Sequence, residues 1–334
     1  MTDSACPVGF LLHPDAPLHD TGWGHPEHQG RLRALASAVG RDLLALHESV
    51  VQVEPGQVTE EDLLRVHTPE YLALIRTAVE RAEKEGTPIS LDADTMVSGA
   101  SWDAATGSTA ALLTATGQVA DGALASAFVA TRPPGHHATP DRAMGFCLIN
   151  HVAVAARWLQ GTGRAERVMI VDWDVHHGNG TQDTFYADGT VFYLSLHQSP
   201  HYPGTGAASE KGVGEGTGWT LNVPLPAATS ADDYSQRFSE ALGQGLEICR
   251  PDFILISAGF DVMAGDPLGG MLLEPEDLHS LTQEVMAGAA ADGVRAADAH
   301  RVGVVAALEG GYDPARTGLG AAAVIRALAG IDLE

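Results

Sequence analysis

Ile170-Val171-Asp172-Trp173-Asp174-Val175-His176-His177-Gly178-Asn179-Gly180 is the stretch that decides how this chain folds. It continues the apolar run 168–171, which predicts a buried strand ending in acids and histidines. Side chains alternate between the two faces of an extended chain. Asp172, Asp174 and His176 would therefore project to the same side if strand geometry continued past the apolar run. A carboxylate and an imidazole two residues apart make half of a divalent-metal site, although an acidic turn after a core strand would have the same sequence.

Three further segments combine an apolar run with polar residues at its end. They are Arg132-Pro133-Pro134-Gly135-His136-His137, Ser257-Ala258-Gly259-Phe260-Asp261 and Leu308-Glu309-Gly310-Gly311-Tyr312-Asp313. The carboxyl ends of parallel strands meet at one edge of a sheet, and ligands bind at that edge. The four endings together predict one site assembled from four loops.

Apolar strands alternate with helical patterns along most of the chain. Uninterrupted runs of Val, Ile and Leu separated by helices predict a parallel sheet that is covered on both faces. No linker or shift in composition is present, so we expect a single α/β domain over residues 1–334. The expected strands are 127–131, 168–171, 191–196, 219–223, 253–257 and 302–308. The expected helices are 31–46, 68–85, 101–117, 150–160, 232–248, 275–290 and one that ends near 329. The expected loops include 8–29, 92–95 and 203–218.

The charge balance limits the partners of the chain. Its 334 residues include 19 basic and 43 acidic side chains, which gives a formal net charge of −24. A surface this acidic repels nucleic acid and anionic membranes and attracts cationic ligands, although high solubility would select the same composition.

No apolar run is long enough to span a bilayer, and the N-terminus lacks the positive start of a secretory signal. Three widely spaced cysteines, Cys6, Cys147 and Cys249, form no disulfide framework, which favours a reducing cytoplasm.

Asp174, His176 and Asp261 are the candidate metal ligands. They would supply two oxygens and one nitrogen, and three protein ligands leave a position open for water or substrate, as in catalytic sites. We expect zinc, although iron(II) or cobalt suits the same mixture of ligands.

His136 and His137 follow two prolines and a glycine, which predict a stiff turn. A histidine beside a bound water can take its proton, because the pKa of imidazole lies near neutrality. Asp172 and Asn179 are candidate hydrogen-bond partners that orient the two rings. Tyr312 follows two glycines that allow close approach, and its hydroxyl can stabilise negative charge on a carbonyl oxygen. Together these residues describe metal-assisted addition of water to an amide or ester carbonyl.

The motifs closely resemble those of the zinc-dependent histone deacetylase family, and in particular its class II and bacterial members, which include acetylpolyamine amidohydrolases. The resemblance rests on Arg-Pro-Pro-Gly-His-His-Ala at 132–138, Gly-Phe-Cys at 145–147, Asp-Trp-Asp-Val-His-His-Gly-Asn-Gly-Thr-Gln at 172–182, Ser-Ala-Gly-Phe-Asp at 257–261 and Leu-Glu-Gly-Gly-Tyr at 308–312. It implies the arginase–deacetylase fold, with an eight-stranded parallel sheet.

The resemblance also implies roles for the candidate residues. It places one zinc ion on the three ligands named above, makes His137 the general base and acid, and makes His136 an electrostatic helper paired with Asp172. Tyr312 would polarise the carbonyl group of the substrate. Class I members have an aspartate where this chain has Asn179, which agrees with class II and leaves the charge on His137 open.

Substrate contacts and potassium sites are implied in the same way. Phe146 and Tyr202 match the aromatic walls of an acyl-lysine tunnel, and Asp92, or its neighbour Asp94, matches a rim aspartate that holds the substrate backbone. Leu268 would lie at the tunnel mouth. A first potassium ion would be bound by Asp172, Asp174, His176, Ser195 and Leu196, and a second by Phe185, Asp188, Val191 and Trp219.

Deacylation of lysine side chains in a peptide or protein is therefore the expected activity, and three alternatives stay open. An acetylpolyamine deacetylase would share the chemistry, and the net charge of −24 favours its cationic substrate. Polyamine-selective relatives have an acidic residue at the tunnel mouth, however, whereas Leu268 is typical of lysine deacetylases. A ureohydrolase of the same fold would need further bridging carboxylates for two manganese ions. A catalytically silent acyl-lysine binding module would lack a ligand or the tyrosine, and none is missing.

Overall fold

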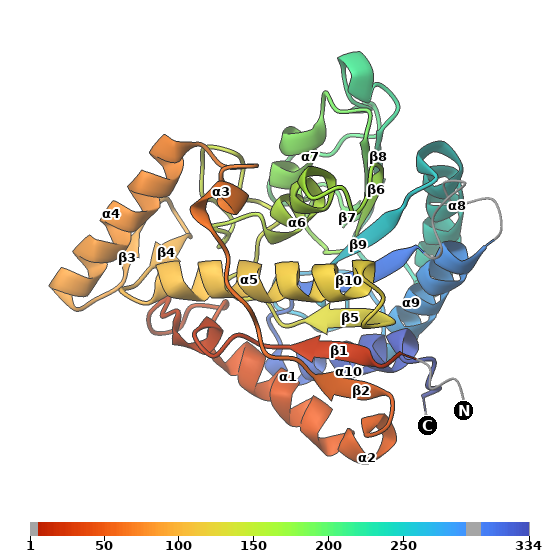
Figure 1. Cartoon of the computed structure of the whole chain (residues 1–334), viewed down its shortest axis with the longest axis horizontal. Helices are drawn as coiled ribbons and strands as arrows, with labels where there is room; N and C mark the ends of the chain where they lie inside the picture. Colours follow the sequence, from red (N-terminus) through yellow and green to blue (C-terminus); the bar gives the residue numbers. More distant parts are fainter. Residues whose placement is uncertain (1–5, 292–301, 334) are drawn as a thin grey trace.

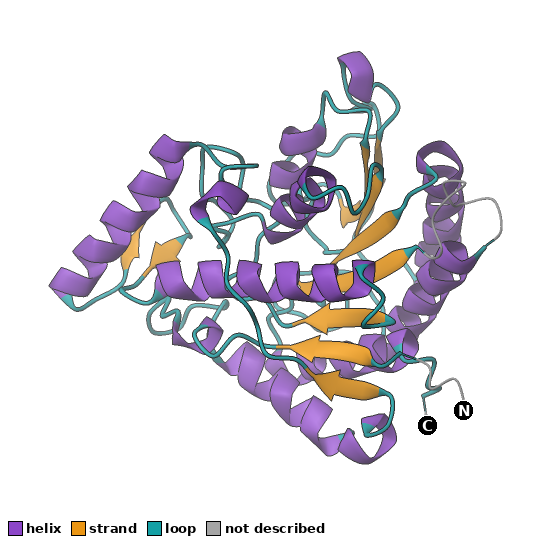
Figure 2. Ribbon diagram, viewed as in Figure 1, coloured by secondary structure: helices purple, strands orange, loops and turns teal. Residues whose placement is uncertain are grey.

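Eight parallel strands form the central sheet of the computed structural model, which describes residues 6–291 and 302–333 (Figures 1 and 2). All of the neighbouring pairs run parallel, so the loops that follow the strands gather at one edge. In spatial order the strands are β2 (Val50–Gln52), β1 (Val8–Leu11), β5 (Ser126–Val129), β10 (Gly303–Leu308), β9 (Phe253–Ala258), β6 (Val168–Asp172), β7 (Val191–Gln198) and β8 (Thr220–Leu225).

Successive residues of each strand bury their side chains on opposite faces of the sheet. In β6, Val168 and Ile170 join one apolar cluster, whereas Met169 and Val171 join the other. Both faces are covered, as predicted. The helices α5 (Ser101–Ala120), α6 (His151–Gly161) and α7 (Asn179–Phe185) lie on the first face, and α1 (Gly30–Arg41), α8 (Ala231–Cys249), α9 (Pro275–Ala290) and α10 (Pro314–Leu328) lie on the second.

Shorter elements surround these layers. They are the 3-10 turns Ala16–Leu18 and Gly214–Gly216, the helices α2 (Leu43–Leu46), α3 (Glu60–Leu63) and α4 (Pro69–Glu85), and the small hairpin β3 (Ile89–Ser90) and β4 (Met96–Val97). The expected loop 92–95 is the turn of that hairpin. Among the described helices, none has the length and apolar character needed to cross a bilayer.

Helix caps fix two of the loops at the carboxyl edge. The side chain of Asp313 accepts hydrogen bonds from the backbone N–H groups of Ala315 and Arg316, at 2.9 and 3.1 Å, and so starts α10 directly after Tyr312. Asn150 caps α6 in the same way, accepting from the N–H of Ala153 at 3.1 Å. The start of α10 therefore determines where the backbone of Tyr312 lies.

The N-terminal third differs from the expectations in three places. Residues 8–11, expected to lie in a loop, form β1, and β2 was not expected at all. Both strands are short, and two of the three β2 residues are exposed, so neither carries the long apolar run of a central strand. The helix expected over 31–46 is divided at Asp42, and Leu43, which directly follows the division, is 59 % exposed.

Candidate active site

The three predicted metal ligands meet at the carboxyl edge of the sheet. Asp174 and His176 lie in the loop after β6, and Asp261 lies in the loop after β9. One ligand atom from each residue lies within 4.8 Å of the other two. Nδ1 of His176 is 3.0 Å from Oδ1 of Asp174 and 3.2 Å from Oδ2 of Asp261. The strand itself ends at Asp172, so a loop conformation, not continued strand alternation, brings the ligands together.

Backbone donors orient the two carboxylates of this group. The N–H of Gly310 donates to Oδ2 of Asp174 at 2.7 Å, and the N–H of Val175 donates to Oδ1 of Asp261 at 2.9 Å. A Cβ atom on Gly310 would lie 2.0 Å from Oδ2 of Asp261, so only glycine allows this approach. Oδ2 of Asp261 is buried, and none of the described residues donates a hydrogen bond to it, so this oxygen is free to ligate a cation.

The electrostatics of the group also fit a divalent cation. Burial and the neighbouring charge of Asp174 raise the pKa of Asp261 to about 7. Burial opposes ionisation of Asp174 too, but His136 and His176 outweigh it and lower its pKa below the ordinary value. The two buried carboxylates therefore repel each other, and a cation bound between them would relieve that repulsion. Their oxygens and the nitrogen of His176 can hold a metal ion, and this donor set is one that zinc accepts.

The adjacent histidines of the turn after β5 have different partners. Nδ1 of His136 lies 3.1 Å from Oδ2 of Asp172, which also accepts from the hydroxyl of Tyr193 at 2.9 Å. Burial alone would lower the pKa of His136, but the carboxylates of Asp174 and Asp172 raise it to about 10. His136 is therefore a protonated imidazole at neutral pH.

His137 is the neutral member of the pair. Its Nδ1–H donates to Oδ1 of Asn179 at 2.9 Å, which leaves Nε2 as the free acceptor. Burial and the positive charge of His136 hold the pKa of His137 well below its ordinary value. Because Asn179 is uncharged, its hydrogen bond orients this ring and raises its pKa less than a carboxylate would.

Glu309 holds the histidine turn, a role that sequence reasoning did not assign. Its Oε2 accepts from the backbone N–H groups of Gly135 and His136, at 2.6 and 3.1 Å, and its Oε1 accepts from the hydroxyl of Ser257 at 3.0 Å. Burial raises the pKa of Glu309 to about 7. The sequence feature that could have indicated this role is the single glutamate that directly follows the apolar run of β10.

Tyr312 is positioned by groups that are remote in sequence. Its backbone N–H donates to Oδ2 of Asp266 at 2.6 Å, and the guanidinium carbon of Arg31 lies 4.9 Å from the centre of its ring. Arg31 also donates from Nε to the carbonyl of Gly311 at 2.6 Å and pairs with Glu27 at 3.0 Å. Burial raises the pKa of Tyr312 well above its ordinary value, so its hydroxyl keeps the proton and acts as a donor.

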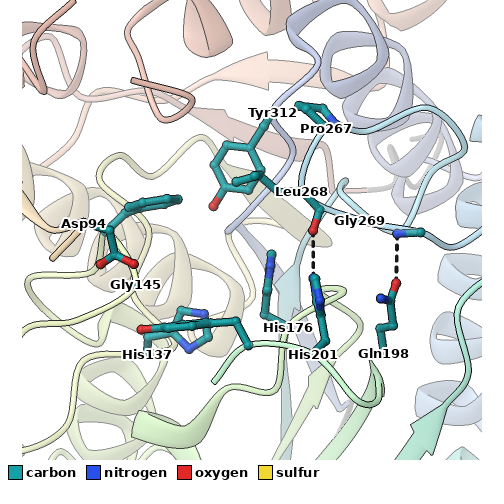
Figure 3. A pocket seen from close by; sticks show the side chains of 13 residues that line it. Asp94, His137, Gly145, His176, Gln198, His201, Pro267, Leu268, Gly269 and Tyr312 are labelled. Carbon is teal, nitrogen blue, oxygen red and sulfur yellow. Dashed lines mark hydrogen bonds between the residues drawn. The ribbon is translucent and has the colours of Figure 1, made fainter. Parts of the chain in front are cut away.

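A pocket of about 450 Å³ joins these groups, and Figure 3 shows His137, His176 and Tyr312 around it. Phe146 contacts Tyr312, with ring centres 5.6 Å apart, and Tyr202 contacts His137, with ring centres 5.2 Å apart. The two predicted walls therefore line the same pocket.

Asp94, not Asp92, lines the rim. Oδ1 of Asp92 accepts from the backbone N–H groups of Asp94 and Thr95, at 3.1 and 2.7 Å, so it closes its own turn. Leu268 lines the pocket as predicted, and His201, which was not predicted, holds it in place. Nε2 of His201 donates to the Leu268 carbonyl at 2.8 Å, and the His201 ring stacks on His176 with 4.9 Å between centres (Figure 3).

The residues predicted to bind potassium lie in two places. In the first set, Asp172 ends β6 and pairs in register with Ser195, which lies within β7 beside Leu196. Asp174 and His176 lie in the loop after β6. The second set, Phe185, Asp188, Val191 and Trp219, lies around the starts of β7 and β8. There the guanidinium of Arg157 is 2.5 Å from Oδ2 of Asp188 and lies over the ring of Phe185. Both potassium sites stay predictions.

One pocket thus combines buried ligand atoms for a metal with a neutral histidine and a tyrosine hydroxyl. This combination is typical of a metal-dependent hydrolase that adds water to a carbonyl group. The family model of the histone deacetylase domain matches residues 25–328, so the chain belongs to the histone deacetylase family. The resemblance predicted from the motifs is confirmed.

Named relatives agree with this assignment. The chain is 36 % identical over 332 residues to a probable deacetylase of Archaeoglobus fulgidus, a match that covers 98 % of this chain and 88 % of the relative. It is 35 % identical over 330 residues to a histone deacetylase-like amidohydrolase of Pseudomonas aeruginosa, covering 97 % and 81 %. The crystal structure of the HDA15 HD domain superposes with a TM-score of 0.87 at 32 % identity, covering 97 % of this chain and 90 % of that one. The chain is thus a deacetylase that hydrolyses amide bonds.

Proposed function

We propose that this deacetylase removes acetyl or other acyl groups from lysine side chains in peptides or proteins, with one zinc ion on Asp174, His176 and Asp261. The observation that carries the proposal is the buried group of ligand atoms from these three residues, because His176 also lines the pocket that receives His137 and Tyr312. Zinc, when bound, acts as a Lewis acid and makes a bound water acidic enough to react near neutral pH.

The chain supplies the proton transfers and the stabilisation of charge. His137 is neutral and has a free Nε2, so it takes the proton from the attacking water and later gives it to the leaving amine. His136 keeps its proton between Asp172 and Asp174 and offsets part of the negative charge of the site. The hydroxyl of Tyr312 donates to the carbonyl oxygen as that oxygen becomes negative.

The pocket suits a lysine side chain that carries an acyl group. Phe146 and Tyr202 provide aromatic walls for the apolar methylenes, and Leu268 adds an apolar surface at the mouth. Asp94 is placed to accept hydrogen bonds from the backbone N–H groups of a peptide. Asp92 supports Asp94 by closing the turn that presents it.

Acetylpolyamines are the second candidate substrates, because the net charge of −24 attracts polycations. A silent binding module is disfavoured, because the three ligands and Tyr312 are all present. We further propose that potassium ions occupy one or both of the predicted sites and stabilise the loops there.

Acetate release from an acetyl-lysine peptide tests the proposal. Protein stripped with a chelator should be inactive, and zinc should restore turnover, with iron(II) and cobalt compared in parallel. Binding of the acetylated peptide without release of acetate under any metal would contradict the proposal and favour the binding module.

A further inference from the structure

A second cleft lies beside the active-site pocket, on the other side of His25. It is lined by residues 19–26, 28 and 29 and by Arg132, and its volume is about 660 Å³; we call it the flanking cleft. The ring of His25 packs edge-on against Phe146, with centres 4.8 Å apart, and its Nε2 donates to the Asp94 carbonyl at 3.1 Å. Phe146 and Asp94 both line the active-site pocket. A peptide with one residue in that pocket can therefore extend a nearby residue into the flanking cleft.

The flanking cleft presents an exposed tryptophan. The side chain of Trp23 is 105 % exposed, whereas the other four tryptophans are buried or partly buried. The loop beneath it is anchored, because the Thr21 hydroxyl donates to the Glu27 carbonyl at 2.5 Å and the Asp20 N–H donates to the Ser98 hydroxyl at 3.1 Å. A solvent-exposed indole on an anchored loop is typical of a binding surface, because a tryptophan that binds no ligand normally packs into the fold.

The charges of the cleft select the kind of ligand. Asp20 is exposed, and its Oδ1 accepts a hydrogen bond from the Gly22 N–H at 2.9 Å, so Oδ2 can accept one from a ligand. The guanidinium of Arg132 donates to both oxygens of Glu27, at 2.7 and 3.0 Å, and Oε1 of Glu27 also accepts from Arg31 at 3.0 Å. Both of these cations are fully buried, whereas Asp20 is exposed. Burial lowers the pKa of His19 to about 4, so it adds no charge at neutral pH. An indole face and a free carboxylate together suit an ammonium or guanidinium group.

We propose that the flanking cleft binds a lysine or arginine side chain that flanks the acyl-lysine of a polypeptide substrate, between the indole of Trp23 and the carboxylate of Asp20. This inference rests on the proposed deacylase function and names its substrate class more closely. A second copy of the chain is a poor occupant, because two surfaces of net charge −24 repel each other. A small acylated amine that fills only the active-site pocket leaves the flanking cleft empty.

The test compares two acetyl-lysine peptides that differ only in the flanking positions, which carry arginine in one and glutamate in the other. The ratio of their kcat/KM values is measured for the unmodified chain and for Trp23→Ala and Asp20→Asn. Leu44→Ala, which removes another highly exposed side chain on α2, is the matched control. Each protein is also run on a size-exclusion column to record its oligomeric state.

The unmodified chain should prefer the arginine peptide, and Trp23→Ala and Asp20→Asn should each reduce that preference about three- to tenfold, since cation–π contacts at exposed sites are modest. Leu44→Ala should keep the full preference. An unchanged preference in Trp23→Ala, or a Trp23→Ala protein that loses an oligomeric state of the unmodified chain, would overturn the inference but not the deacylase function. No acetate from either peptide would overturn both.

Discussion

Two regions of this molecule bury histidines, and they shift the pKa of the imidazole in opposite directions. At the catalytic edge, which we define as the loops after β5, β6, β9 and β10, His136 lies against the carboxylates of Asp174 and Asp172, which overcome burial and raise its pKa to about 10. In the supporting layer, the α3–α6 side of the sheet, His67 and His151 have backbone carbonyl and neutral partners, and burial lowers each pKa to about 4. The partner, not the depth of burial, sets the charge.

The two regions are joined by the turn that carries the catalytic histidines. Nε2 of His151 donates to the Pro133 carbonyl at 3.0 Å, before the histidine pair, and Nδ1 of His67 donates to the Thr139 carbonyl at 3.1 Å, after it. Neutral histidines thus hold both ends of the turn without adding charge to the catalytic edge. Stability and catalysis therefore depend on different imidazoles.

The largest expected effect is at the catalytic edge. Asp261→Ala should remove the bound metal and reduce turnover to background, because the remaining two ligands cannot hold a divalent ion tightly. Metal content is measured by elemental analysis and turnover by acetate release, with circular dichroism to confirm folding. Stoichiometric zinc in the variant would show that Asp261 is not a ligand, and the carboxylate-rich edge would need another explanation.

Tyr312→Phe should reduce kcat about a hundred- to a thousandfold, which corresponds to roughly 3–4 kcal/mol for one lost donor to an oxyanion. The ring, its contact with Arg31 and the metal content should all be kept. This variant separates the hydroxyl from the packing of the catalytic edge. A decrease smaller than about tenfold would make Tyr312 a packing residue.

The supporting layer predicts how stability depends on pH. Folding lowers the pKa of His67 from 6.5 to about 4, so the unfolded chain binds the proton more readily. The contribution of His67 to stability is complete above pH 6.5 and is lost as the pH falls toward 4. Between pH 7.5 and 5, about 2 kcal/mol of the free energy of unfolding should be lost through this one histidine.

Urea unfolding at the two pH values checks this. His67→Asn should begin less stable but lose about 2 kcal/mol less on acidification than the unmodified chain. Metal ligands titrate in both proteins, so their contribution cancels in the comparison. His47→Asn, at an exposed histidine, is the control and should follow the unmodified chain. An equal loss in His67→Asn would mean that His67 is charged in the fold, and the contrast between the two regions would fail.

The same contrast explains what the sequence could predict. The metal group and the histidine pair follow apolar strands directly, and parallel strands bring such endings together whatever the helices do. Arg31, Asp266 and His201 come from elements whose apposition depends on packing, and no local pattern marks them. Asp92 and Asp94 occupy one turn, so only the backbone hydrogen bonds decide which of them faces the pocket.

The smallest expected effect concerns substrate choice, and it depends on Leu268 at the mouth of the pocket. A leucine offers only apolar contact to an acyl-lysine stem, whereas a carboxylate there would attract the free amine of a polyamine. The net charge of −24 also favours polyamines, but salt screens this diffuse field over about 10 Å. A residue at the mouth acts at contact distance and should dominate.

We therefore expect higher kcat/KM on acetyl-lysine peptides than on N-acetylputrescine, and Leu268→Glu should move the ratio toward the polyamine by about tenfold. Leu268→Met, which keeps the apolar volume, should leave the ratio unchanged. If the unmodified chain prefers acetylpolyamines, the overall charge outweighs the local contact, and the polyamine becomes the favoured substrate.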